Sequence, residues 1–464
     1  MVAIPLAYGA SVRDVGRFPE FVTQNMFVEK TPSNQANGLA LVGRAGLEAF
    51  ATAGVGPIRA VFQRSGVFNG DVLVVSGSTL YRVTMGAVVT AATGTVPGAG
   101  RVRIDCGPNG TVDEARIACG EDGICLFDGT TVSQEDFPDD AGVDDILFLR
   151  GFWIAIRRGT QTLYSRVPGD LVWDPITYTA AEYKPDLAIA LESLGDTLMV
   201  FGATTMEPFA LTGNATNPVE PYGGNAQDVG CRSRDAVVSF VDAVFSVGDD
   251  CAVYKFTPGK QVISDPGLAE RIRKTSASDL RAWGYVQDQQ AFYILSLSGE
   301  TWVYADGVGW AKWKSKDYDY FRGHLGANVS GRVIAADSLP ASGQLWRVTP
   351  EKLTDNGEEI ERIASGYIEV KGGKVACNNV RLNCAVGHAP LTGQGSAPLV
   401  GLSISDDGIN WDAYMWRSLG PLGKYGTEVR WNGLREMKAP GRHFRFKTTD
   451  PTIVRFSDAR MNEL

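Results

Sequence analysis

The sequence predicts an all-β protein whose main body is a β-propeller of about seven blades, with six to eight consistent with the repeats. Helical periodicity is nearly absent apart from a short stretch around Leu268–Leu280. A strand–turn–strand pattern recurs instead, and its successive starts lie roughly 38 to 48 residues apart. In an all-β chain, a period of roughly 40 to 50 residues is typical of propeller blades.

Seven stretches carry the repeated pattern: a short strand, a turn with Gly or Asp, and a second strand that ends in an aromatic or large apolar residue. They cover Asp71–Val83, Glu114–Gly129, Phe152–Val167, Asp196–Leu211, Asp242–Phe256, Gln290–Trp313 and Gly331–Val348. Because a lone hairpin is marginally stable in water, each is expected to form the centre of a four-stranded blade packed on both faces. A set of β-sandwiches is the rival interpretation, and the even spacing favours the propeller.

Residues 1–50 precede the repeats and have a different pattern. Single apolar residues are mixed with Pro, Asn and Gly, as in "FPEFVTQNMFVEKTPSNQANGLALVGRAGL". This pattern predicts an extended N-terminal arm laid over another surface. The alternative is blade closure, in which an N-terminal strand completes the last blade. The first residues lack the basic start and the long apolar core of a secretory signal, so we expect none.

A second domain is predicted after the repeats, which divides the chain into an arm (1–50), a propeller (51–353) and a C-terminal β-sandwich-like domain (354–464). The polar segment Thr354–Ser365 is expected to separate the two units, and longer alternating runs follow it. One turn, "SISDDGINW", has the D-x-G-x-x-W spacing at Asp406, Gly408 and Trp411. The Asp is expected to cap the turn and the Trp to pack beneath it, a structural feature rather than a catalytic one.

The charge is acidic overall, with a net charge of −9 and a pI near 5.1. Proteins that wrap DNA tightly usually have the opposite sign, although an acidic protein can let DNA slide past. The acids gather in the segment Gln134–Asp145, at Glu135, Asp136, Asp139, Asp140, Asp144 and Asp145. This segment lacks the EF-hand pattern of calcium ligands. A solvated loop is the default interpretation, and a loop that faces something negative is the sharper hypothesis.

The last part of the chain is basic. A solvated face is the ordinary explanation, and a surface that docks on an acidic neighbour is the sharper one. The residues assigned to such a surface are Arg430, Arg435, Arg442, Arg445 and Arg455.

No catalytic, cofactor or metal site is predicted. The three histidines, His324, His388 and His443, lie in separate segments, and no nucleophile elbow or phosphate loop is present. The seven cysteines include no C-x-x-C pair and are expected to be buried free thiols. Trp302, Trp310 and Trp313 lie inside hairpins, so we expect core positions rather than a sugar platform. No stretch reaches the roughly 20 apolar residues that a membrane-spanning helix needs.

Several stretches resemble the tail nozzle proteins of short-tailed double-stranded DNA bacteriophages, also called packaged-DNA stabilisation proteins or tail accessory factors. They occur in the family's order along nearly the whole chain, and "FxLTGxAT" is the most distinctive. The stretches are Gln24–Leu47, Leu147–Ile156, Thr204–Thr216, Leu402–Trp411 and Arg445–Leu464.

The resemblance implies a non-enzymatic structural protein of the virion tail, made in the host cytoplasm. Nozzle subunits form a homo-hexamer below the portal and adaptor, anchor tail fibres or spikes, and are closed at the far end by a plug or needle. Packaged double-stranded DNA passes through the lumen without sequence-specific binding. An acidic lumen suits this role, because each Lys or Arg contact with phosphate adds affinity that must be broken as DNA moves. We therefore expect the acidic loop Glu135–Asp145 to face the channel. The alternative function is a carbohydrate-binding or glycan-degrading propeller.

Overall fold

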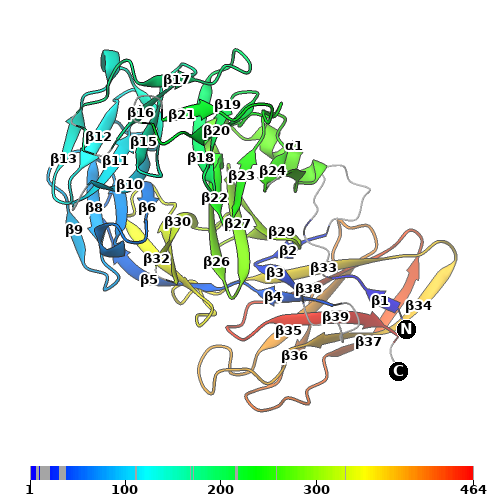
Figure 1. Cartoon of the computed structure of the whole chain (residues 1–464). Helices are drawn as coiled ribbons and strands as arrows, with labels where there is room; N and C mark the ends of the chain where they lie inside the picture. The colour runs from blue at the N-terminus through cyan, green and yellow to red at the C-terminus, as the bar shows by residue number, and fades with distance from the viewer. Residues whose placement is uncertain are drawn as a thin grey trace.

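The computed structural model describes residues 2–6, 10, 21–30, 38–109, 112–167, 169–170, 172–214, 218–257, 259–329 and 331–462. The strands form a β-propeller at the upper left of Figure 1 and a C-terminal β-sandwich at the lower right. The prediction of an all-β fold with these two parts is therefore confirmed. Within the described ranges, no helix is long and apolar enough to span a membrane.

The described strands between residues 46 and 349 make seven antiparallel blades of four strands each. Blade 1 contains β6 (Ile58–Phe62), β7 (Val72–Ser76), β8 (Thr79–Val83) and β9 (Val89–Ala91). Blade 2 contains β10 (Arg103–Asn109), β11 (Val112–Ala118), β12 (Ile124–Phe127) and β13 (Val132–Glu135). Blade 3 contains β14 (Val143–Leu149), β15 (Phe152–Arg157), β16 (Thr162–Arg166) and β17 (Tyr178–Ala180). Blades 4 and 5 contain β18 (Ala188–Leu194), β19 (Thr197–Gly202), β20 (Met206–Leu211) and β21 (Val219–Pro221); and β22 (Val238–Phe240), β23 (Ala243–Val247), β24 (Val253–Phe256) and β25 (Lys260–Val262). Blade 6 contains β26 (Arg281–Gln287), β27 (Gln290–Leu297), β28 (Glu300–Ala305) and β29 (Gly309–Trp313). Blade 7 contains β30 (Gly323–Val329), β31 (Arg332–Asp337), β32 (Gln344–Thr349) and β5 (Gly46–Thr52).

The repeated hairpins recognised in the sequence are the two middle strands of each blade, and in blade 6 the stretch Gln290–Trp313 also includes β29. All five residues of β7 are buried, because neighbouring blades cover both of its faces. The turn that joins β7 to β8 has Gly77 with a φ of 57°. A left-handed residue at this place matches the turn to the twist of the two strands, and glycine adopts it without steric cost.

The last blade is closed by a strand from the beginning of the chain. β5 pairs antiparallel with β32, so blade 7 combines residues 46–52 with residues 323–349. Strand pairing therefore supports the blade-closure alternative for this part of residues 1–50. The closure joins the two ends of the propeller segment and supplies the outermost strand of blade 7.

The sandwich takes strands from both ends of the chain. One sheet contains β1 (Val2–Ile4), β3 (Met26–Lys30), β4 (Leu39–Gly43), β34 (Lys374–Cys384), β37 (Arg430–Lys438) and β39 (Arg455–Met461). The facing strands are β33 (Arg362–Glu369), β35 (Leu399–Ser405), β36 (Met415–Ser418) and β38 (Gly441–Thr448). Their inner faces share one apolar core that includes Leu402, Trp431, Phe444 and Phe446. The described parts of the predicted arm are thus built into sheets, and residues 7–9, 11–20 and 31–37 lie outside the described ranges.

A short strand makes the two bodies share a sheet. β2 (Thr23–Gln24) runs parallel to β29 of blade 6 and antiparallel to β33 of the sandwich. The result is a nine-stranded sheet that continues from β26 through β2 to β36. A shared sheet resists bending between the bodies, because bending would break backbone hydrogen bonds.

The predicted helical stretch is shorter than its pattern and begins earlier. Helix α1 spans Pro266–Lys274, between blades 5 and 6. Asp265 caps its start by accepting a hydrogen bond from the Leu268 amide at 2.8 Å, and Pro266 occupies the first turn. Leu268 and Ile272, four residues apart, form the buried face of the helix.

We expect that removing apolar contacts at the seam will destabilise the propeller. Leu47 lies in β5 and is 2% exposed. Leu47→Ala should cost about 2–5 kcal/mol in the free energy of unfolding, measured by urea titration. The control Leu391→Ala changes a side chain that is 79% exposed, and it should cost less than about 0.5 kcal/mol. Equal effects of the two changes would contradict the role of β5 in closure.

Candidate functional site

The innermost strands of the seven blades line a central cavity of about 410 Å³. Its walls come from β6, β10, β14, β18, β22, β26 and β30. The cavity is the place where a propeller most often presents converging groups, so its charges decide what the axis can hold.

Ion pairs link blades 1 to 4 around the axis. Arg103 of blade 2 bonds Glu192 of blade 4 and lies 3.5 Å, Nε to Oδ1, from Asp145 of blade 3. Arg64 of blade 1 contacts Asp105 of blade 2, with Nη2 and Oδ1 separated by 3.0 Å. These pairs tie blades 1 to 4 together, and the axial cavity of about 410 Å³ is too small for a nucleic-acid duplex.

Two of these carboxylates also hold the backbone of the following blade. Asp105 accepts a hydrogen bond from the Phe148 amide of blade 3 at 2.7 Å. Asp145 accepts one from the Leu191 amide of blade 4 at 2.8 Å. Burial raises the pKa of both carboxyl groups above their ordinary values, and arginine partners oppose the shift. These acids therefore fix the angle between successive blades.

The six acids of the predicted loop separate into two groups. Asp145 is buried at the axis, as described above. The Glu135 side chain is 9% exposed; it accepts bonds from Arg116 at 2.9 Å and from Trp173 at 3.1 Å, and it also pairs with Arg166. Burial would raise the pKa of Glu135, but these partners outweigh burial and lower it. Neither side chain is free to face an external channel.

The other four acids form a surface segment that we call the acidic turn: Asp136, Asp139, Asp140 and Asp144. Asp136, Asp139 and Asp140 are exposed, and Asp144 is half-buried. Arg157 lies 3.0 Å from Asp139, and Arg158 pairs with Asp144. Across the described residues, no three His, Cys, Asp or Glu side chains come together as a metal site would require.

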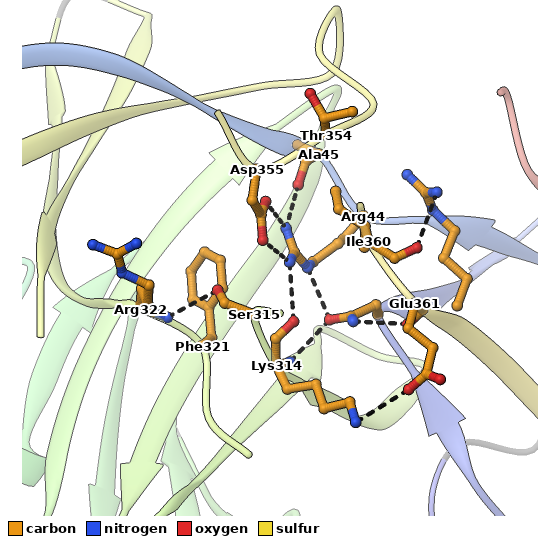
Figure 2. A network of polar contacts seen from close by, with 12 residues as sticks. Arg44, Ala45, Lys314, Ser315, Phe321, Arg322, Thr354, Asp355, Ile360 and Glu361 are labelled. Atoms are coloured by element: carbon orange, nitrogen blue, oxygen red, sulfur yellow. Dashed lines mark hydrogen bonds and ion pairs between the residues drawn. The ribbon is translucent and has the colours of Figure 1, made fainter. Parts of the chain in front are cut away.

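A second polar centre lies at the junction of the two bodies, between β4 and β5. The Arg44 guanidinium is fully buried and forms a bidentate pair with Asp355, at 2.8 and 2.6 Å. Figure 2 shows Arg44 reaching Asp355 on one side and the Lys314 region on the other. Arg44 also donates to the Asn25 side chain at 2.9 Å and to the carbonyl of Lys314 at 3.1 Å. One side chain thus joins the linker, blade 6 and the N-terminal strands.

Glu361 makes the second part of this junction. It lies 3.1 Å from Lys314 of blade 6, accepts a bond from Gln24 at 2.9 Å, and pairs with Lys447 of the sandwich. Burial would raise the pKa of Glu361, but the hydrogen bonds from Lys447, Gln24 and Lys314 outweigh burial and lower the pKa to about 2. The segment Thr354–Ser365, expected to separate the units, instead supplies Asp355 and Glu361 to the contacts that join them.

The predicted basic surface is only partly external. Arg442 is 1% exposed and forms a bidentate pair with Asp406, at 2.6 and 3.1 Å. The Arg445 guanidinium stacks on Trp411 at 3.7 Å from the ring centroid. The remaining three are more accessible, and each has an acidic neighbour: Arg435 with Asp412, Arg430 with Glu428 and Arg455 with Glu29.

The turn with D-x-G-x-x-W spacing is capped one residue later than expected. Asp407, not Asp406, accepts the amide hydrogens of Ile409 and Asn410, at 2.8 and 2.7 Å. A hydrogen bond from the Asn410 side chain, together with these two backbone bonds, lowers the pKa of Asp407 well below its ordinary value. Asp406 pairs with Arg442 instead, because its side chain lies on the other side of the turn.

The three tryptophans and the cysteines lie mostly in the core, as the sequence predicted. Trp302, Trp310 and Trp313 are 2%, 6% and 1% exposed, so they belong to the core and offer no sugar platform. The seven cysteines are free thiols, and all except Cys384 are buried.

Sequence reasoning missed Arg44 and Asp355, because a charged residue beside a glycine turn is usually solvated. Only the tertiary structure, which places both side chains at the junction of the propeller and the sandwich, identifies them as functional residues.

These observations define a class: a seven-bladed propeller, closed at its axis, whose last blade and C-terminal sandwich are both completed by the N-terminal segment. The family model for "Bacteriophage P22 Gp10, beta-propeller" matches residues 2–352, and that for "Bacteriophage P22 Gp10, beta-sandwich" matches residues 362–463. The chain belongs to the phage P22 Gp10 family. It is accordingly a structural protein of a phage tail.

Individual relatives agree with this assignment. The chain is 29% identical to the tail hub protein gp10 of Salmonella phage P22 over 380 residues, which cover 75% of this chain and 78% of that protein. Solved structures are more distant. The β-propeller domain of Cps50 (Swd1) from Myceliophteria thermophila matches with a TM-score of 0.42 and 11% identity, covering 65% of this chain and 100% of that domain. The computationally designed Ika8 protein matches with a TM-score of 0.38 and 10% identity, covering 65% and 100%. These two likenesses carry no argument about function.

We expect that breaking the buried pair at the junction will destabilise the protein strongly. Asp355→Asn keeps the side-chain shape but leaves the Arg44 charge uncompensated, which should cost about 3–5 kcal/mol in the free energy of unfolding. The control Asp196→Asn disrupts the pair with Arg150, whose side chains are 66% and 55% exposed. It should cost less than about 1 kcal/mol. If urea titrations gave similar losses in the free energy of unfolding for both variants, the Arg44–Asp355 pair would stabilise the protein no more than a surface pair does.

The pKa of Glu361 predicts how junction stability depends on pH. The folded pKa of about 2 lies below the unfolded value of about 4.3, so the contribution is present above pH 4.3 and disappears as the pH falls toward 2. Glu361→Gln should lower the melting temperature at pH 7, and its difference from the wild type should shrink between pH 4.3 and 2. The control Glu351→Gln changes an exposed residue just before the segment Thr354–Ser365 and should show no such trend. A constant difference for Glu361→Gln across this range would contradict the assignment.

Proposed function

We propose that six copies of this chain form a ring, the nozzle of a phage tail. The ring extends the channel of the portal and adaptor, retains packaged DNA and conducts it during ejection. It also anchors tail fibres or spikes, and a plug or needle closes the far end. The carrying observation is that both bodies match the Gp10 family in order, together with the likeness to a tail hub protein. This role requires no catalytic residue.

The closed axis supports a conduit between subunits rather than through each one. The axial cavity has a volume of only about 410 Å³, and Arg103 and Glu192 pair on its wall, so a duplex has no path inside a single propeller. A lumen for DNA must then lie at the centre of a ring of copies. Rings of identical chains form through heterologous interfaces that close after a fixed rotation.

The rigid junction supports the same architecture. A closed ring requires every copy to present its two interface surfaces at one angle. The continuous sheet through β2 and the contacts of Arg44 and Glu361 fix the sandwich relative to the propeller. A chain with a flexible linker would present a range of angles and would form open or irregular assemblies.

We assign the acidic turn, Asp136, Asp139, Asp140 and Asp144, to the lumen, where negative charge keeps DNA centred and mobile. Glu135 and Asp145 take no part, because both are paired inside the subunit. The docking surface for an acidic neighbour then consists of Arg430, Arg435 and Arg455. Arg442 and Arg445 support it from within the sandwich.

The oligomeric state tests the proposal. Native mass spectrometry of the full chain, alone and with portal and adaptor proteins, should give a species of six copies. A glycan array and a hydrolysis screen should both be silent. A monomer under all these conditions that binds or cleaves a saccharide would overturn the nozzle and support the glycan-degrading alternative.

Charge removal at the acidic turn tests the lumen assignment. The triple variant Asp136→Asn, Asp139→Asn, Asp140→Asn should assemble normally, because Asn also tolerates the positive φ of residues 139 and 140. Particles that carry it should eject DNA more slowly at low salt, and the difference should fade as salt screens the lumen. The control Asp242→Asn, Asp288→Asn, Asp317→Asn removes the same charge from exposed positive-φ turns elsewhere. Equal slowing by both triples would refute the assignment.

A further inference from the structure

A second cavity, of about 260 Å³, lies between blades 6 and 7. It is lined at the start of β26 and of β30, and at the turn between β27 and β28. Its polar lining residues are Asp279, Arg281, Ser296, Ser298, Thr301, Tyr320, His324 and Ser338. Four of them bring buried polar atoms that have no hydrogen-bond partner in the described part of the chain: Arg281, Ser296, His324 and Ser338.

Blade 6 contributes a cation and a hydroxyl that face each other across two strands. Arg281 and Ser296 are directly paired in the β26–β27 register. The Arg281 Nε and the Ser296 Oγ are both buried without a partner, and Ser296 is 7% exposed. Arg281 forms no ion pair with any described residue, including Asp279, the one carboxylate that lines the cavity. A partly buried guanidinium without a counter-charge is unfavourable, so this arrangement calls for an anion.

Blade 7 contributes two further donors from the opposite wall. His324 occupies the bulge between Gly323 and Leu325 of β30 and is 6% exposed, with Nδ1 lacking a partner. Ser338 follows β31, and its Oγ is likewise buried and unpartnered. Burial, reinforced by the positive charges of Arg101 and Arg281, holds the pKa of His324 well below its ordinary value. Backbone hydrogen bonds with Ala336 and Arg322 oppose this shift. A neutral imidazole has one N–H, and when Nδ1 carries it this N–H is available to a ligand.

The neighbouring axis adds positive charge. Arg101, which precedes β10, is near enough to Arg281 for the two guanidinium groups to repel each other. Asp235 is its acidic neighbour at 3.5 Å, and Arg234 shares that carboxylate. Burial, partly opposed by Asp235 and reinforced by Arg281, lowers the pKa of Arg101 to about 10. The field at the cavity thus favours an anion.

The donor set defines the chemistry of the ligand. A guanidinium, two hydroxyls and an imidazole N–H converge from two blades, and such groups suit an oxyanion with several acceptor oxygens. Buried polar atoms without partners are rare in folded proteins, and an ion is a standard explanation for them. The unpartnered Arg281 Nε, Ser296 Oγ, His324 Nδ1 and Ser338 Oγ are buried, so the cavity suits a small free ion better than the phosphates of a duplex.

We propose that the cavity between blades 6 and 7 binds one small tetrahedral oxyanion, of the inorganic phosphate or sulfate class, through Arg281, Ser296, His324 and Ser338. The ion is a structural ligand. It neutralises Arg281 and joins blade 6 to blade 7, the blade completed by β5. It therefore stabilises the propeller beside its seam, whether or not the chain forms a nozzle.

Calorimetric titration of the full chain with inorganic phosphate, and separately with sulfate, in a chloride buffer tests the site. We expect one saturable site for the wild type and a rise in melting temperature with oxyanion concentration. Arg281→Gln should weaken binding by at least roughly tenfold, because it removes a charge-assisted contact. The matched control Arg273→Gln changes an exposed arginine of α1 and should bind like the wild type.

Two further arms keep the test decisive. Ser338→Ala removes one hydroxyl without removing a charge and should fold normally but bind the oxyanion more weakly. A short DNA duplex added to the phosphate titration should leave the affinity unchanged. Absence of saturable binding, wild-type affinity in both Arg281→Gln and Ser338→Ala, or competition by the duplex would each overturn the proposal.

Discussion

The buried guanidinium of Arg44 is the constraint on which the arrangement of the two bodies depends. It pairs with Asp355 of the linker and binds Asn25 and the carbonyl of Lys314, so three distant parts of the chain meet at one side chain. A buried charge is costly unless all its hydrogens are bonded. That requirement makes the junction all-or-none: the linker, blade 6 and the N-terminal strands take their positions together. Beside it, Glu361 pairs with Lys314 of blade 6 and with Lys447 of the sandwich, and so joins the two bodies in the same way.

The N-terminal segment joins the propeller and the sandwich into one rigid unit. β3 and β4 belong to the sandwich, β5 closes the propeller, and β2 links the sheets of both. Neither body is complete without residues from the first 52, although each has its own apolar core. Such interleaving produces a stiff unit, because separating the bodies would expose backbone groups as well as apolar surface.

Charge in this protein has two uses. Inside the propeller, Asp105 and Asp145 pair with arginines and hold the backbone of the next blade. On the surface, the acidic turn is available to a partner. The two kinds of acid are only a few residues apart in sequence, as Asp144 and Asp145 show. A β-bulge explains the difference, because the pairing of β14 with β15 passes from Val143 to Asp145 and leaves Asp144 out of the ladder.

The sequence by itself determined the all-β class, the propeller and its seven hairpins, and the domain that follows, because strand alternation and turn residues are local and repeat with the blade. It also indicated that Trp302, Trp310 and Trp313 are core residues, since each lies inside a repeat. Only the tertiary structure decided which charges are buried. Glu135, Asp145 and Arg442 look in the sequence like solvated side chains, yet each has partners from distant segments. Pairing across the fold, such as Arg44 with Asp355, depends on distances that no local pattern encodes.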